Sequence, residues 1–114
     1  MIKNLNLEQF IDEVVNGSRP CVVKFLSKGC HLCVEFAPIF ENLHEKYNNA
    51  FNFYKIDIEQ EKELSEHYAK GGVPTVYVFT SMGEYEIPDP KKPDEKTWFT
   101  EKYISDTLEM LKEL

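Results

Sequence analysis

Apolar residues recur every three or four positions in four segments of the chain, which is the spacing of a helix with one buried face. These segments predict helices over about 7–15, 30–47, 61–70 and from about 100 onwards. Asn6 and Gln9 have the spacing of a capping box at the start of the first helix, and Gly17 suits its end. Pro38 lies inside the second helix, where it removes a backbone hydrogen bond and is expected to cause a kink.

Runs of apolar, β-branched and aromatic residues between these helices predict strands over about 21–26, 51–57, 75–79 and 84–87. The first run is apolar throughout except for Lys24, which is typical of a strand buried on both faces. Residues 81–83 read as a hairpin turn between the last two strands, and the proline-rich charged stretch over 88–96 reads as a loop.

The predicted order is helix, strand, helix, strand, helix, strand, strand, helix. Helices between the early strands imply parallel pairing, and the late hairpin implies an antiparallel edge. The pattern therefore predicts an α/β fold, a mixed central sheet with helices on both faces. With no repeat and no long linker, residues 1–114 are expected to form a single domain.

Charge and composition narrow the class of protein. The 114 residues include 20 acidic against 13 basic side chains, a net charge of −7. Such a chain repels phosphate groups, which argues against nucleic acids and anionic membranes as partners. No apolar run has the length of a signal peptide or a membrane span, so we expect a cytoplasmic protein. In that reducing compartment the three cysteines are not expected to form structural disulfides.

The candidate chemistry lies in Cys30-His31-Leu32-Cys33, at the junction of a strand and a helix. Free N–H groups and the dipole at a helix start favour the thiolate of a cysteine placed there. Cys33, one turn further on the same side, is placed to attack a mixed disulfide formed by Cys30. The alternatives are half of a zinc site or two core thiols. Zinc needs four ligands, and the remaining cysteine and histidines show no second paired spacing. We therefore expect no metal and no cofactor.

Together these motifs resemble the thioredoxin family. The matching residues are Cys30 and Cys33, Pro38 five positions later, and the stretch Gly72-Val73-Pro74-Thr75 before a strand. The resemblance covers about 6–87 and the last helix. It implies a thioredoxin fold whose sheet has about four strands, or five if the N-terminus adds a short one.

The resemblance also implies roles for individual residues. Cys30 would be the attacking nucleophile and Cys33 the buried resolving thiol. Pro74, expected after a cis peptide bond, and the backbone of Val73 would dock a substrate strand beside Cys30; otherwise Pro74 is an ordinary turn proline. The implied function is a monomeric protein-disulfide oxidoreductase, with protein disulfides as substrates and a reductase as electron donor. The alternative is a thioredoxin-fold binding module that retains its cysteines with little turnover.

The motif departs from the family pattern at three positions. Gly29 stands where many thioredoxins have tryptophan, and His31 and Leu32 replace Gly-Pro. A protonated His31 beside Cys30 would stabilise the thiolate and make the disulfide more oxidising, unless the side chain is simply solvated.

The larger departure is Lys24, at the position where the family often has an aspartate that accepts the proton of the resolving thiol. Lys55 matches the lysine that usually pairs with that aspartate, and two lysines cannot form such a pair. Lys24 could reach Glu35 or Asp57, or point out of the core. Its positive charge should favour the thiolate, and so a disulfide more oxidising than that of thioredoxin at about −270 mV.

Two further features have open interpretations. Cys21 reads as an inert core thiol or as an additional redox thiol. Trp98 and Phe99 either pack the last helix against the core or line a partner surface.

Overall fold

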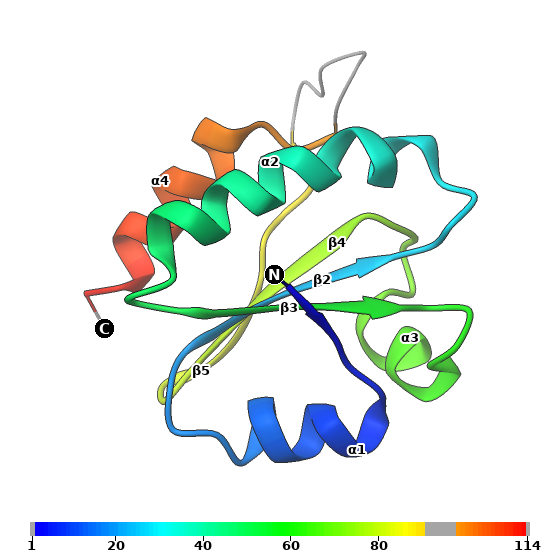
Figure 1. The fold of residues 1–114 in the computed structure, drawn as a ribbon, viewed down its shortest axis with the longest axis horizontal. Helices are drawn as coiled ribbons and strands as arrows, with labels where there is room; N and C mark the ends of the chain where they lie inside the picture. Colours follow the sequence, from blue (N-terminus) through cyan, green and yellow to red (C-terminus); the bar gives the residue numbers. More distant parts are fainter. Residues whose placement is uncertain (1, 91–97, 114) are drawn as a thin grey trace.

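The computed structural model describes residues 2–90 and 98–113, and within them a sheet lies between two layers of helices (Figure 1). The strands are β1 (Lys3–Asn4), β2 (Cys21–Leu26), β3 (Asn52–Asp57), β4 (Thr75–Thr80) and β5 (Gly83–Glu86). The helical segments are α1 (Leu7–Phe10), η1 (Ile11–Val15), α2 (His31–Tyr47), α3 (Lys62–Tyr68) and α4 (Glu101–Leu111). The element types and order agree with the sequence prediction, including the short additional strand near the N-terminus.

The strand order is β1-β3-β2-β4-β5. β2 pairs in parallel with β3 and antiparallel with β4, so it is hydrogen-bonded on both sides. β4 and β5 form the predicted antiparallel hairpin. The result is a mixed α/β sheet in which β2, the strand leading to the cysteine motif, is the central one.

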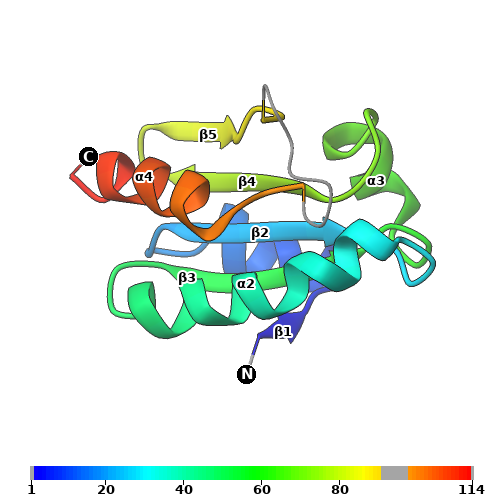
Figure 2. The same ribbon diagram turned by 90° about the horizontal axis from the view of Figure 1, so that it is seen from above.

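Helices cover both faces of the sheet. α2 and α4 lie on one face, and α1 and α3 lie on the other (Figures 1 and 2). Each layer encloses its own cluster of buried side chains, the first around Phe36, Phe40 and Leu108, and the second around Phe10 and Phe25. Because β2 contributes alternate residues to both clusters, it is apolar along its whole length except at Lys24.

The first helical segment differs from the prediction in its hydrogen bonding. The capping box is present, since the Gln9 N–H donates to Asn6 Oδ1 (2.8 Å) and the Asn6 N–H donates to Gln9 Oε1 (2.9 Å). The predicted α-helix then continues as the π-helix η1, which has a wider turn. At its end the Asn16 N–H donates to the Ile11 carbonyl, five positions earlier (2.9 Å). A side chain at Gly17 would collide with the Glu13 carbonyl, which explains a glycine at this end.

The predicted loop over 88–96 lies largely outside the described residues, but its C-terminal flank is described. Phe99 is fully buried and its ring lies 5.4 Å from that of Phe36. Trp98 is partly buried against the same cluster, and its indole N–H donates to Asp89 Oδ1 (3.3 Å). The packing role expected for this pair is therefore confirmed for Phe99, whereas Trp98 also faces a cavity described below.

Candidate redox site

Cys30 is the N-cap of α2 and lies just beyond the C-terminal end of β2. The backbone N–H of Cys33 donates to Cys30 Sγ (3.1 Å), so the sulfur occupies the place of a capping oxygen. A helix start favours negative charge through its free N–H groups and its dipole. The structure therefore places Cys30 at the start of a helix, as the sequence predicts.

The two motif cysteines differ in exposure. Cys33 is 5% exposed, whereas Cys30 is partly exposed. Burial, together with the hydrogen bond to Cys30, raises the pKa of the Cys33 thiol to about 12. A backbone hydrogen bond with Ser27 and the charge of Lys24 act in the opposite direction. At neutral pH Cys33 is thus a shielded thiol behind an accessible Cys30 sulfur.

Val73 and Pro74 lie directly beside Cys30. The Val73–Pro74 peptide bond is cis, as predicted, and the Cys30 thiol donates to the Val73 carbonyl (3.8 Å). Gly72 has φ of +108°, a conformation that favours glycine, and its carbonyl accepts from Thr75 Oγ1 (2.6 Å). The fold thus joins the predicted docking edge to the predicted nucleophile across more than forty positions of sequence.

Lys24 is buried with the rest of β2, at 5% exposure, so it does not point out of the core. Its Nζ lies 4.8 Å from the ring centroid of Phe40 and 5.8 Å from that of Phe36. Among the described residues it forms no ion pair with Glu35 or Asp57, since the strand register directs it toward the rings of α2. Cation–π contacts therefore replace the ion pair that a buried charge usually requires.

The surroundings of Lys24 make its charged form unfavourable. Lys24 is the register partner of Lys55 on the neighbouring strand β3. Burial, followed by the charge of Lys55, lowers the pKa of Lys24 to about 8, against weaker attraction from Cys33 and Glu41. Lys24, Lys28, Lys55 and Cys33 line one cavity of about 180 Å³. The resolving thiol is therefore surrounded by basic side chains.

The remaining motif positions are more open. A Cβ atom at Gly29 would meet nothing within 4 Å apart from its chain neighbours, so a side chain could begin there without a collision. His31 is exposed at the first position of α2, and Leu32 is half-buried beside Pro74.

Cys21 is separated from the motif by the length of β2. It is fully buried, and its thiol donates to the Arg19 carbonyl (3.3 Å). Burial raises its pKa to about 11, so it is protonated at neutral pH. Both properties favour the inert-core interpretation over an additional redox thiol.

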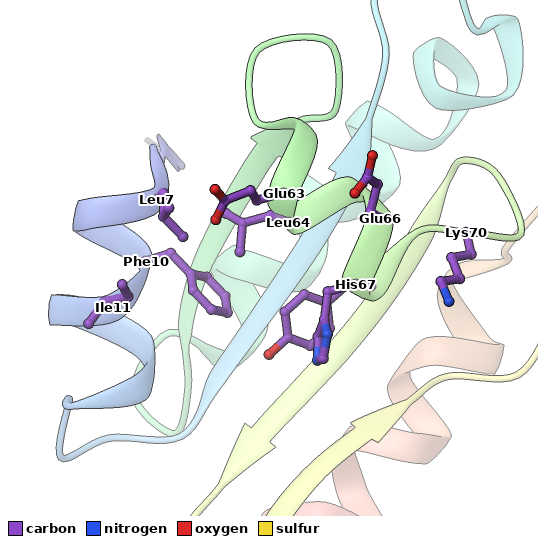
Figure 3. Close-up of a pocket in the computed structure, with 9 residues that line it drawn as sticks. Leu7, Phe10, Ile11, Glu63, Leu64, Glu66, His67 and Lys70 are labelled. Carbon is purple, nitrogen blue, oxygen red and sulfur yellow. The ribbon is translucent and has the colours of Figure 1, made fainter.

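A larger groove lies on the opposite face of the sheet from α2. Its volume is about 560 Å³, and it separates α1 from α3 (Figure 3). Phe10 and Ile11 approach it from one side and Leu64 and His67 from the other. None of the residues that line it is a cysteine. The described residues contain no metal-binding group of three or more His, Cys, Asp or Glu side chains, and no helix of membrane-spanning length and hydropathy.

Comparison with known proteins agrees with this geometry. The family model described as "Thioredoxin" matches residues 1–98. A thioredoxin of Borreliella burgdorferi is 37% identical over 71 residues, 62% of this chain and 61% of that protein. Thioredoxin domain-containing protein 8 of Mus musculus is 34% identical over 79 residues, 68% of this chain and 60% of that protein. The chain thus covers about three fifths of the length of these relatives.

A solved structure shares the whole fold. The crystal structure of chloroplastic thioredoxin z superposes with a TM-score of 0.80, covering 99% of this chain and 96% of that chain. The sequence identity is 16%, so this likeness concerns the fold alone.

The structure predicts an order of alkylation. Brief treatment of the reduced protein with iodoacetamide below neutral pH should modify Cys30 first, because it is the accessible sulfur at a helix start, while Cys33 and Cys21 are buried. Peptide mass mapping after increasing pulse lengths measures the order. Earlier modification of Cys33 or Cys21 would refute the assignment of the nucleophile.

Burial of Lys24 predicts a pH-dependent stability difference. The displacement of its pKa from 10.5 to about 8 corresponds to about 3 kcal/mol of destabilisation below pH 8. Lys24→Met should therefore raise the free energy of unfolding by about 1–3 kcal/mol at pH 7. The range extends below 3 kcal/mol because the variant also loses the stabilising cation–π contacts. Urea titration of both proteins measures this difference.

The difference should shrink as the pH rises from about 8 to 10.5. In that window unfolded wild-type chains still bind the Lys24 proton that the folded protein has released, so wild-type stability rises relative to the variant. Lys28→Met, which changes an exposed lysine of the same cavity, is the control and should show no such trend. A constant difference for Lys24→Met across this range contradicts the assignment.

Proposed function

We propose that this chain, which belongs to the thioredoxin family, is a thiol–disulfide oxidoreductase that exchanges a Cys30–Cys33 dithiol or disulfide with protein substrates. The observation that supports it best is the arrangement around Cys30. An accessible sulfur caps α2, a buried thiol lies one turn behind it, and the carbonyl of Val73 is 3.8 Å away on a free docking edge. These are the nucleophile, the resolving group and the binding edge that such an exchange needs.

In the reductive direction, the Cys30 thiolate attacks one sulfur of a substrate disulfide. A Cys30–substrate mixed disulfide forms, and the other substrate sulfur leaves as a thiolate that takes up a proton. Cys33 then loses its proton and attacks Cys30 Sγ, which releases the second substrate thiol. Two electrons pass from the cysteine pair to the substrate, and the pair is left as a Cys30–Cys33 disulfide.

The second step requires an acceptor for the Cys33 proton, because the pKa of this thiol is raised to about 12. A charged ammonium at Lys24 could not act in this way. With its pKa lowered to about 8, however, a fraction of Lys24 is a neutral amine near neutral pH, and this form can accept a proton. The lysine therefore offers a base, though a less abundant one than an aspartate would be.

We further propose that the protein is cytoplasmic and monomeric, and that an electron-donor reductase returns it to the reduced state. We expect it to bind neither nucleic acid nor membrane. The net charge of −7 supports the exclusion of phosphate-rich partners. The exposed sulfur of Cys30 beside a docking edge supports proteins, rather than small thiols alone, as substrates.

The alternative is a binding module with little turnover. The observation that favours it is Lys24, which stands where an efficient relative often has an aspartate, and which makes the resolving step slower at low pH. The two functions differ in whether a disulfide substrate is turned over.

Turnover tests the proposal directly. With dithiothreitol as reductant, the protein should accelerate the reduction of insulin disulfides, and Cys30→Ser should abolish the acceleration. Cys33→Ser should instead accumulate a mixed disulfide with substrate, because the first step remains and the second is lost. Cys21→Ser is the control and should retain activity. A wild-type protein that binds insulin without accelerating its reduction supports the binding module.

The basic surroundings of Cys33 predict the direction of a change in reduction potential. Lys24→Asp removes a positive charge that stabilises thiolate and so should make the potential more negative, by about 30 mV or about 1.4 kcal/mol. The same variant should resolve mixed disulfides faster at pH 6, where the carboxylate is ionised and Lys24 is protonated. Equilibration with glutathione measures the potential, and a folded variant unchanged in both properties would exclude a redox role for Lys24.

A further inference from the structure

A second cavity of about 180 Å³ borders the docking edge, on a different side of the motif from the lysine-lined cavity. We call it the Trp98 pocket, and it is lined by Leu32, Gly71, Gly72, Val73, Pro74, Thr75, Glu86, Asp89 and Trp98. Val73, one of these residues, accepts the hydrogen bond from Cys30 Sγ. A substrate strand that docks on Val73 with its sulfur at Cys30 therefore passes the mouth of this pocket.

The walls of the Trp98 pocket combine apolar surface with negative charge. Leu32, Pro74 and the ring of Trp98 supply the apolar part, and the carboxylates of Glu86 and Asp89 supply the charge. Glu86 accepts one hydrogen bond from the Tyr77 hydroxyl (3.3 Å), and Asp89 accepts one from the Trp98 indole (3.3 Å). Within the described part of the chain, neither carboxylate forms an ion pair.

We propose that the Trp98 pocket is a specificity site that binds a lysine or arginine side chain of the substrate strand, close to the cysteine under attack. The inference rests on the proposed function and adds the class of substrate. A long basic side chain has an apolar stem that fits Leu32, Pro74 and the indole ring, and a cationic head that pairs with carboxylates. An acidic side chain would be repelled, and an apolar one would desolvate the carboxylates without compensation.

The chemistry of the pocket distinguishes this occupant from a metal ion. Two carboxylates fall short of the six or more oxygen ligands that a hard cation such as calcium takes. The hydrogen bond from Trp98 to Asp89 instead fixes a flat ring next to a negative charge, which is the combination that an ammonium or guanidinium group prefers. The net charge of −7 would also attract basic substrates over a longer range.

Matched peptide disulfides test the proposal. Each peptide carries one cysteine of a mixed disulfide and differs from the others only in a Lys, Gln or Glu residue placed two positions before or after that cysteine. For wild-type protein we expect kcat/KM to fall in the order Lys, Gln, Glu, by about three- to tenfold in total, since the carboxylates are exposed at the pocket rim. The difference should lie in KM, with kcat unchanged for the Gln peptide.

Charge-neutral variants identify the residues responsible. The double variant Glu86→Gln/Asp89→Asn should lose the preference for Lys and reduce all three peptides at the rate of the Gln peptide. The control is Glu84→Gln/Glu59→Gln, which removes the same net charge at exposed positions outside the pocket and should retain the preference. Trp98→Leu should weaken the preference for the Lys peptide over the Gln and Glu peptides, because the indole ring no longer faces the cationic group. A preference lost equally in the control would overturn the pocket, because net charge alone would then explain it.

A binding measurement separates this inference from the proposed function. Trp98 is the one tryptophan of the chain, so its fluorescence reports on the pocket. Peptides with serine in place of cysteine cannot react, and the Lys peptide should change the Trp98 emission at lower concentration than the Glu peptide. Equal affinities would overturn the pocket even in an active enzyme. A clear Lys preference in a protein without turnover would support the pocket and overturn the oxidoreductase.

Discussion

The site depends on the pairing of β2 with both of its neighbours. The antiparallel register with β4 sets Phe25 opposite Thr75, so the turn before β4, with its cis Val73–Pro74 bond, comes to lie beside the connection that follows β2. That connection ends at Cys30, the N-cap of α2. One register thus determines the distance between the nucleophilic sulfur and the docking edge, and a slip by a single residue would turn the side chains of β2 to the other face.

Burial then gives the two cysteines different chemical properties. Cys33 is buried, which favours its uncharged thiol, and Cys30 is partly exposed with a backbone N–H directed at its sulfur. Lys24 is directed toward the rings of Phe36 and Phe40 because alternate residues of β2 face α2. The protein therefore tolerates a destabilising buried amine next to the resolving thiol, which is typical of positions retained for function rather than for stability.

Charges are distributed differently on the two sides of the motif. The side chains of Lys24, Lys28 and Lys55 line the same cavity as Cys33, and of the three only Lys24 is buried. The carboxylates of Glu86 and Asp89 lie at the opposite side, beside the docking edge. In the proposed function, the first group would act on the sulfurs and on the proton that the resolving step releases, and the second would face an approaching substrate. Reactivity and substrate preference are thereby assigned to separate residues, so each can be altered without the other.

The sequence by itself determined the order of the elements, the helix cap at Asn6 and the position of Cys30 at a helix start, because each follows from local periodicity or a short motif. The cis bond before Pro74 was expected from the resemblance to the thioredoxin family. It did not determine where Lys24 points, since a single lysine in an apolar run is compatible with burial or exposure. The π-helical turn of η1 was also missed, because a three-to-four spacing does not distinguish it from an α-helix. The Trp98 pocket, joining residues from α2, the turn before β4, β5 and Trp98, exists only through tertiary packing. Contacts between distant segments are set by strand register and layer packing, and no local pattern records them.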